Sequence, residues 1–180
     1  MEANAHLFSI ADACPDCTHG LAMVNFTAWQ ETYRNIIHDS FINSLNLETY
    51  VERWERILAG NAKSRFVLVA KSTDGEIAGY CMGGRVQQPF KQFEGEIYAL
   101  YLLKKYHGKG VGGRLFREAM LRLQQMNFNS ACLFVLRNNP TIDFYRHFKP
   151  DFETTTTVQI DGKEYDDVAL GWSRLTSVSV

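Results

Sequence analysis

The chain has 180 residues, 46% of them hydrophobic and 13% aromatic, which is enough apolar material to bury a core and excludes a disordered chain. Its formal net charge of -1 argues against the basic surface that binding to nucleic-acid phosphates requires. No stretch reaches the roughly 18 apolar residues of a bilayer span, and the N-terminus lacks the pattern of a signal peptide. We therefore expect a single cytoplasmic domain over residues 1–180, with no membrane or nucleic-acid partner.

The N-terminal third is predicted to hold one strand followed by helices. Residues 7–11 form a short apolar run that ends at turn-forming residues and Pro15. Apolar residues then recur at helical spacing to about residue 58, and Gly60 ends this pattern. Cys14 and Cys17 form a Cys-x-x-Cys pair that is compatible with half a zinc site or a redox pair. Because no second such pair follows, we expect reduced thiols and no metal.

The middle of the chain changes to a strand pattern. Residues 66–70 and 77–82 are β-rich runs on either side of Asp74-Gly75, a strong hairpin signal. Residues 96–103, EIYALYLL, are nearly continuous in apolar residues and predict a central strand.

A glycine-rich loop follows that strand and leads into a helix. Four glycines occupy six positions in residues 108–113, and apolar residues then repeat every four positions to Leu123, typical of an amphipathic helix. Residues 131–136 form another buried strand, so the segment predicts a parallel βαβ unit. Asn139 is placed to cap a short helix, with Pro140 at its first position. Residues 154–160 and 165–172 form a closing hairpin. The fold class is therefore mixed α/β, of the α+β type.

The glycines have a physical role at this junction. A helix that starts directly after a strand presents unpaired backbone N–H groups and the positive end of its dipole to an anion. The missing Cβ atoms let a phosphate approach the backbone, and Lys109 adds positive charge. The loop therefore predicts a pyrophosphate cradle, with tight packing of strand against helix as the plain alternative.

A nicotinamide dinucleotide is one candidate ligand. Gly108, Gly110 and Gly113 satisfy G-x-G-x-x-G, but no Asp or Glu for a ribose hydroxyl occurs between residues 118 and 143. Arg137 suits a 2′-phosphate, so an NADP-dependent oxidoreductase stays open as an alternative. The P-loop pattern is absent.

Two segments resemble the Gcn5-related N-acetyltransferase (GNAT) family. YLLKKYHGKGVGGRLF is similar to its acetyl-CoA-binding motif, [RQ]-x-x-G-x-[GA], and RNNPTIDFYRHFKPDF is similar to its downstream N-x-x-A-x-x-F-Y segment. His107 and Thr141 depart from the usual Arg or Gln and the usual Ala, and the chain is longer around residues 149–151. The resemblance implies a mostly antiparallel sheet with a parallel acetyl-CoA-binding core, and direct attack of a primary amine on acetyl-CoA in a ternary complex.

Direct attack requires a base and an acid. An alkylamine with a pKa of about 10.4 is protonated at neutral pH and must first lose a proton. Glu96, placed with Tyr98, Leu100 and Leu102 on one strand face, is the candidate base by resemblance, and Glu94 competes with it. Tyr145 is the candidate acid for the departing thiolate.

The remaining assignments also follow from the resemblance. The acetyl-CoA-binding residues would be Leu102, His107, Gly108, Lys109, Gly110, Val111, Gly112, Gly113 and Asn138. The acceptor would lie against residues 29–50 and 154–172, whose aromatic and acidic content favours a small polyamine-like or aminoglycoside amine, with a peptide amine open. The family often forms dimers, so a homodimer is possible. A non-catalytic acyl-CoA-binding sensor is the second alternative.

Overall fold

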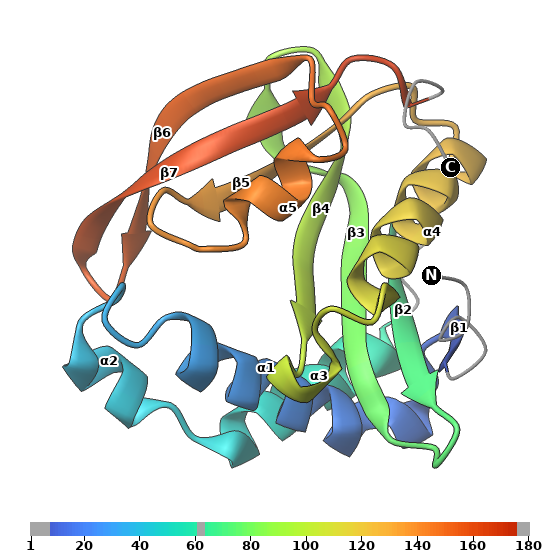
Figure 1. Ribbon diagram of the computed structural model, residues 1–180, viewed down its shortest axis with the longest axis vertical. Helices are drawn as coiled ribbons and strands as arrows, with labels where there is room; N and C mark the ends of the chain where they lie inside the picture. Colours follow the sequence, from blue (N-terminus) through green and yellow to red (C-terminus); the bar gives the residue numbers. More distant parts are fainter. Residues whose placement is uncertain (1–7, 61–63, 176–180) are drawn as a thin grey trace.

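The computed structural model describes residues 8–60 and 64–175, which build one seven-stranded sheet with helices on both faces (Figure 1). The strand order is β1-β2-β3-β4-β5-β7-β6, and all neighbours are antiparallel except β4 and β5. The strands are β1 (Phe8–Asp12), β2 (Arg65–Ser72), β3 (Ile77–Phe90), β4 (Phe93–Leu102), β5 (Ala131–Leu136), β6 (Phe152–Ile160) and β7 (Lys163–Trp172). The predicted mixed sheet and its parallel βαβ unit are confirmed.

The predicted turns carry the backbone conformations that their residues favour. Gly75 has φ +81° between β2 and β3, and Asp161 and Gly162 have φ 49° and 72° between β6 and β7. These left-handed values match the tight turns that join antiparallel strands. The predicted first strand is β1, although Leu7 lies outside the described residues.

Three helices fill the N-terminal region, where the sequence predicted helical material. They are α1 (Thr18–Thr32), which follows a 3-10 turn, η2 (Pro15–Cys17), then α2 (Asp39–Ser44) and α3 (Leu47–Ala59). The Asn46 side chain accepts the Glu48 N–H and so caps α3, which ends at Gly60. Trp54 of α3 packs edge-on against Tyr80 of β3, with ring centroids 4.8 Å apart.

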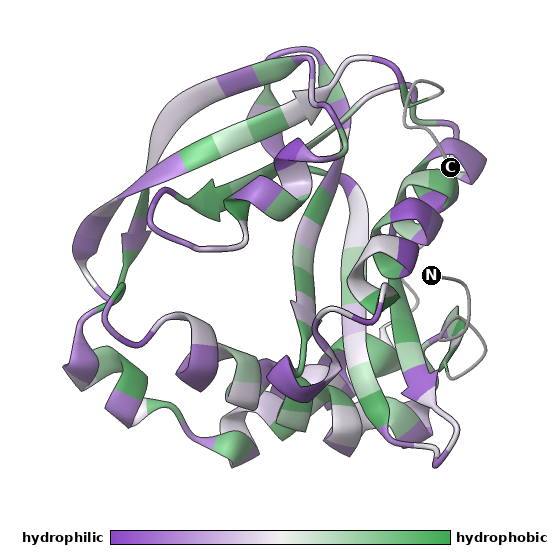
Figure 2. Cartoon of the chain, in the orientation of Figure 1, coloured by the Kyte–Doolittle hydropathy of each residue, from purple (hydrophilic) through white to green (hydrophobic). Residues whose placement is uncertain are grey.

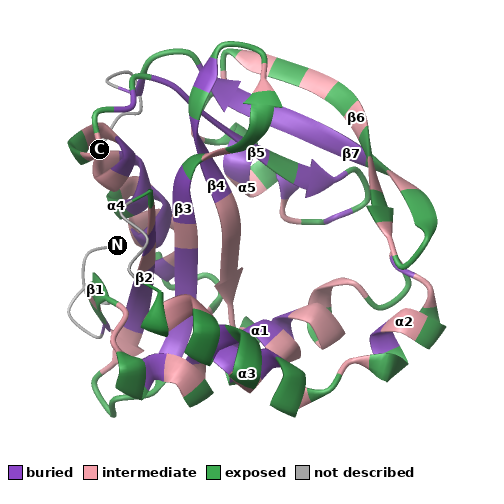
Figure 3. Cartoon of the chain, turned by 180° about the vertical axis from the view of Figure 1, so that it is seen from behind, coloured by how far each residue is buried: buried purple, intermediate pink, exposed green. Residues whose placement is uncertain are grey.

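Hydrophobic clusters pack on both faces of the sheet. Residues of α1 and α3 pack with Val69 and Tyr80 on one face, whereas α4 (Val111–Gln125) and α5 (Ile142–Arg146) pack with Leu68 and Leu133 on the other. Figure 2 shows apolar and polar residues alternating around α4, as its amphipathic pattern predicts. Figure 3 shows the buried residues concentrated in the central strands.

β4 and β5 are paired over only three residues each and then separate. Their register covers Gly95–Ile97 against Ala131–Leu133, and Figure 1 shows the two strands running apart beyond it. β3 residues Gly83 and Met82 face Ile97 and Ala99, so Tyr98 is an extra residue in β4, a β-bulge. The sheet therefore opens at the C-terminal end of β4.

The bulge corrects one prediction about β4. Leu100 and Leu102 pack in the core beneath α4, together with Ile97, whereas Tyr98 and Ala99 line a cavity with α3. Glu96 neighbours Ile97 in the unbulged part and therefore points to the α3 side. The expectation that Glu96 shares a face with Leu100 and Leu102 is wrong, because one extra residue reverses the alternation.

The start of α5 also differs from its prediction. The helix begins at Ile142, two residues after Pro140, with Thr141 at its N-cap position. The Asn139 side chain instead accepts the Thr141 N–H at 2.9 Å, forming a turn ahead of the helix. Among the described residues, no helix has the length and apolar character needed to cross a bilayer.

Candidate active site

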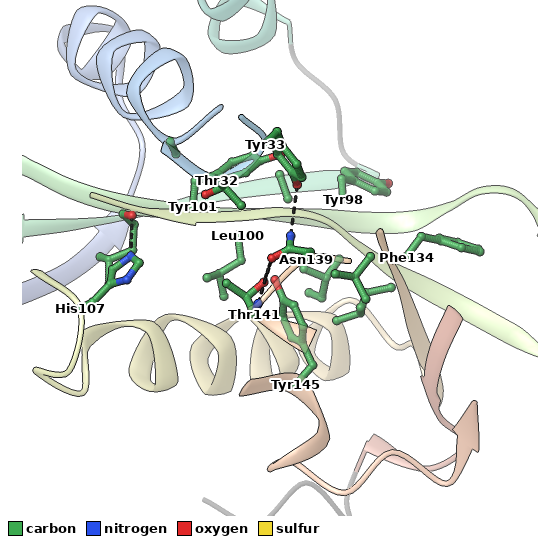
Figure 4. Close-up of a pocket in the computed structure, with 16 residues that line it drawn as sticks. Thr32, Tyr33, Tyr98, Leu100, Tyr101, His107, Phe134, Asn139, Thr141 and Tyr145 are labelled. Atoms are coloured by element: carbon green, nitrogen blue, oxygen red, sulfur yellow. Dashed lines mark hydrogen bonds between the residues drawn. The ribbon is translucent and has the colours of Figure 1, made fainter. Parts of the chain in front are cut away.

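A cleft of about 80 Å³ occupies the opening between β4 and β5 (Figure 4). Its walls come from the end of α1, the bulged half of β4, the outer half of β5 and the segment around α5. Side chains that line it include Thr32, Tyr33, Tyr98, Leu100, Tyr101, His107, Phe134, Asn139, Thr141 and Tyr145. Two of the predicted side chains, His107 and Tyr145, lie here, together with Leu102.

The glycine loop lies between β4 and α4, after a short 3-10 turn, η3 (Lys104–Tyr106). Gly108 and Gly110 have φ 71° and 78°, left-handed values that favour glycine, and Gly110 is the N-cap of α4. The Arg114 N–H donates to Gly110 O, which leaves the preceding N–H groups of the first turn without intrahelical acceptors. The loop therefore has the backbone geometry of an anion cradle.

The space beside the first turn of α4 is open. A Cβ atom built on Gly112 would approach nothing closer than Phe144, at 3.6 Å, and one on Gly113 nothing closer than Arg117, at 3.5 Å. These are ordinary contact distances, so the fold itself does not require glycine at either position. Lys109 Nζ lies 5.2 Å from the centre of the Tyr106 ring.

The edge of β4 that faces the cleft offers main-chain polar groups. The Leu103 N–H donates to Ala78 O on β3, so Leu102, one residue earlier, directs its polar groups to the opposite edge. His107 Nε2 donates to Leu102 O at 3.0 Å. The His107 ring thus ties the end of β4 to the glycine loop.

Tyrosines and an asparagine form a hydrogen-bonded group in the cleft. Asn139 Nδ2 donates to Tyr33 Oη at 3.5 Å, and Tyr33 Oη lies 3.4 Å from Tyr101 Oη. Asn139 is buried, whereas Asn138, the residue selected from the sequence, is exposed. Tyr33 lies within residues 29–50, which were predicted to face the acceptor. Tyr101 was not predicted as a site residue, since nothing local in the sequence marks residues that meet only through folding.

Tyr145 lies in the cleft with most of its surface buried. It is 8% exposed, and burial raises the pKa of its phenol well above the ordinary value. The ring packs against Phe116 and Phe144, with centroids 5.8 and 5.1 Å away. The hydroxyl is therefore held in place and stays protonated at neutral pH.

Glu96 is a buried carboxylate on the α3 side of β4. It is 7% exposed and accepts two hydrogen bonds from Gln87, from the backbone N–H at 2.9 Å and from Nε2 at 3.1 Å. Burial raises its pKa, and the two hydrogen bonds oppose that shift. The competing Glu94 instead accepts the Asn129 N–H at 2.7 Å, at the loop before β5.

The acidic residues of the last hairpin do not converge on one place. Asp161 contacts His38 Nε2 at 3.0 Å, and Asp166 pairs with Arg137 at 3.5 Å, both exposed. Asp167 is 6% exposed, and burial raises its pKa to about 6, although the Val168 N–H donates to it. Leu136, directly opposite Asp167 on β5, packs in one hydrophobic cluster with Tyr33, so Asp167 lies on the sheet face that carries Tyr33. Burial raises the pKa of Tyr33, and the charge of Asp167 adds to that shift.

The buried charge of Asp167 predicts a stability effect with a definite pH dependence. The Asp167 carboxyl has a pKa of about 6 in the folded protein and of 3.8 in the unfolded chain. As the pH rises from 3.8 to about 6, the unfolded chain loses this proton more readily than the folded protein, and the free energy of unfolding therefore falls. We expect Asp167→Asn to raise the free energy of unfolding by roughly 1–3 kcal/mol at mildly alkaline pH. Urea titrations should show that the increase in unfolding free energy caused by Asp167→Asn becomes smaller as the pH falls toward 3.8.

The neighbouring Asp166 gives a matched control. Asp166→Asn removes an exposed pair with Arg137, which is worth less than about 1 kcal/mol. A gain for Asp167→Asn that is the same at low and high pH would show that the carboxylate charge is not its cause.

Cys14 and Cys17 stand apart from the cleft. Their Sγ atoms lie 3.1 Å apart at the start of α1, and both are free thiols. Within residues 8–60 and 64–175, no three His, Cys, Asp or Glu side chains are grouped in a way that could hold a metal ion.

One family model and one curated relative match this chain in sequence. A sequence model described as the Acetyltransferase (GNAT) family matches residues 29–149. The chain is 31% identical over 159 residues to the "Uncharacterized N-acetyltransferase YuaI" of Bacillus subtilis (strain 168), with 88% of each chain covered.

Solved structures of similar fold include two with bound coenzymes. The PaiA N-acetyltransferase of Thermoplasma acidophilum, in complex with coenzyme A, has a TM-score of 0.67 at 20% identity, covering 89% of this chain and 97% of that one. The putative acetyltransferase YncA of Salmonella typhimurium, with its cofactor acetyl-CoA, has a TM-score of 0.66 at 15% identity, covering 93% and 94%.

Proposed function

The chain belongs to the acetyltransferase (GNAT) family, and from this premise we propose that it acetylates a primary amine at the cleft between β4 and β5, with Glu96 as base and Tyr145 as acid. Acetyl-CoA is the acyl donor and supplies the activated acetyl group as a thioester. The oxidoreductase and the binding-module alternatives find no support among the relatives. The observation that carries the proposal is the edge of β4 that is unpaired beyond Ile97. This edge lies between the cleft that contains Tyr145 and the first turn of α4, whose N–H groups have no intrahelical acceptors.

The residues present fit coenzyme A as a ligand. The first turn of α4 would hold the pyrophosphate through the backbone of Gly110, Val111, Gly112 and Gly113, and the missing Cβ atoms leave room for it. Gly108 and Lys109 would complete the cradle. Leu102 faces the gap where β5 has diverged, so its main chain would bind the amide groups of the pantetheine arm. His107 would act by positioning Leu102 O, and the exposed Asn138 would contact the arm near α5.

Glu96 would remove the proton that prevents attack. A protonated amine has no lone pair to donate, and a carboxylate with a raised pKa is a stronger base than an exposed one. Gln87 occupies one acceptor position on each carboxylate oxygen, which leaves further lone pairs free. The proton passes from the ammonium group to Glu96, directly or through one water. Tyr145 would then donate its phenolic proton to the departing sulfur.

Glu96→Gln tests the base. We expect kcat/KM for an amine acceptor to fall by about 10- to 100-fold at neutral pH, near the lower end of general-base effects. The wild-type rate should rise with pH as Glu96 loses its proton, at a pH above the ordinary glutamate pKa of about 4.3. The variant should lack this rise and approach the wild type only near the pKa of the amine. Steady-state kinetics against pH measures both.

Glu94→Gln is the control on the same strand. The Glu94 carboxylate accepts a hydrogen bond from the Asn129 N–H at the loop before β5. The variant should therefore keep the wild-type dependence of kcat/KM on pH. An unchanged rate for Glu96→Gln, with Glu94→Gln impaired instead, would exchange the two assignments.

A further inference from the structure

We propose that Asp167 binds a second, non-reacting cationic nitrogen of the acceptor, so that the preferred substrate is a linear di- or polyamine. This inference rests on the proposed acetyl transfer at the cleft and assigns the part of the acceptor that lies beyond it. The argument depends on three features of one sheet face: an unpaired buried carboxylate, an exposed aromatic ring and their spacing from Glu96.

Asp167 is a buried carboxylate without a charged partner. It is 6% exposed, and among the described side chains none forms an ion pair or a hydrogen bond with it. Thr156, directly opposite on β6, has a buried hydroxyl that likewise lacks a hydrogen-bond partner in the described part of the chain. Burying a charge without a partner is costly, so a site that retains one is suited to a cationic ligand.

The surroundings of Asp167 lead to the cleft. Leu136, directly opposite Asp167 on β5, packs with Tyr33, and Tyr33 hydrogen-bonds with Asn139 and Tyr101 in the cleft wall. Two basic side chains of the hairpin region are engaged elsewhere: His38 contacts Asp161, and Arg137 pairs with Asp166. Neither side chain is therefore a partner of Asp167.

Phe134 supplies an apolar surface between the two carboxylates. On β5, Cys132 is opposite Glu96 and Leu136 is opposite Asp167, and Phe134 lies midway on the same face. Its side chain is unusually open for a large apolar residue, at 38% exposure, and it lines the cleft at the end away from His107 (Figure 4). Methylene groups would pack on this ring, which also attracts neighbouring cations through its π face.

The register sets the length of ligand that fits. Cys132 and Leu136 are four residues apart, which is about 13 Å along β5 at about 3.3 Å per residue. Glu96 and Asp167 lie on the strands on either side of β5, and the two strand spacings of about 4.8 Å bring the distance between their Cα atoms to roughly 16 Å. A short diamine would leave Asp167 unreached, whereas a longer chain would place one nitrogen near Glu96 and another near Asp167.

A series of acceptors measures this spacing. Linear α,ω-diamines from putrescine to 1,12-diaminododecane are compared as acceptors with alkyl monoamines of matching length. We expect kcat/KM for diamines to peak at an intermediate length and there to exceed the matched monoamine by about 10- to 100-fold, the range of one charge-assisted contact. In Asp167→Asn, diamines should be turned over no faster than the matched monoamines, whereas Asp166→Asn should keep the diamine advantage.

Direct binding separates this inference from the proposed function. The carboxyl carbon of Asp167, assigned through the Asn variant, is followed by NMR against pH without acetyl-CoA. Saturating 1,8-diaminooctane should lower its pKa from about 6, and octylamine should not. Equal pKa values with both ligands would overturn the inference even if amines are acetylated. A preference for amines that carry a carboxylate, which Arg53 and Arg65 at the neighbouring cavity would bind, would overturn it as well. A shifted pKa without turnover would instead contradict the proposed function alone.

Discussion

We expect Gly112→Val to lose acetyl-CoA binding, with the dissociation constant raised by at least about 100-fold, or about 2.7 kcal/mol. Gly112 is the second residue of α4, in the first turn whose N–H groups have no intrahelical acceptors. A valine side chain there would occupy the space through which a pyrophosphate approaches the backbone. Isothermal titration with acetyl-CoA measures the loss.

The same variant should remain folded. Outside its own helix, the nearest atoms to a Cβ on Gly112 belong to the Phe144 and Leu102 side chains, at 3.6 to 4.0 Å, which are ordinary contact distances. Its thermal unfolding should therefore stay close to that of the wild type. Normal acetyl-CoA affinity in a folded Gly112→Val protein would contradict the assignment of this turn as the cradle.

A substitution at Gly110 tests whether a loss of acetyl-CoA affinity comes from backbone strain in general or from the glycine loop itself. Gly110→Ala forces a side chain onto a residue with φ 78° and should cost about 1–2 kcal/mol of stability. Gly162→Ala imposes a similar strain at φ 72° in the β6–β7 turn, far from the cradle along the chain. A loss of acetyl-CoA affinity in the first variant only would assign the effect to the loop.

The second large effect is expected for Tyr145→Phe, which should lower kcat by about 100- to 1000-fold through loss of the general acid. The change deletes one hydroxyl and keeps the ring that packs against Phe116 and Phe144, so folding and acetyl-CoA affinity should be retained. Because burial raises the pKa of Tyr145, the wild-type kcat should not fall at moderately alkaline pH from loss of this proton. Single-turnover kinetics would isolate the chemical step.

Tyr50→Phe provides a control of similar burial outside the cleft. Tyr50 is 9% exposed in α3, compared with 8% for Tyr145, and packs against Phe26. Its variant should keep the wild-type kcat. If Tyr145→Phe also keeps it, a water molecule or Tyr33 delivers the proton to the sulfur.

The strand and helix order was predictable because each element is specified by local residue chemistry. The alternation around Asp74-Gly75, the apolar run of β4 and the four-residue repeat of α4 each concern neighbours in sequence. The glycine loop belongs to the same class, since left-handed φ values at Gly108 and Gly110 are preferences of the residues themselves. Glu96 and Tyr145 were identified through the resemblance, and their roles remain predictions.

The shape of the acceptor side depends on contacts that residue order does not encode locally. The bulge at Tyr98 depends on how β4 pairs with β3, and it reversed the expected face of Glu96 relative to Leu100 and Leu102. Asn139, rather than Asn138, reaches the cleft because it meets Tyr33, 106 positions away.

Asp166 and Asp167 show the difference between what residue order and what tertiary contacts determine. Asp166 and Asp167 are adjacent and chemically identical, and the sequence placed both in a group of acidic residues near the acceptor. Strand alternation directs Asp166 to solvent and Arg137, and Asp167 to the buried face on which Leu136 packs with Tyr33. Local preferences act through a few neighbouring bonds and are readable from residue order. Burial, and with it the charge state of a carboxylate, depends on distant segments that only the folded chain brings together.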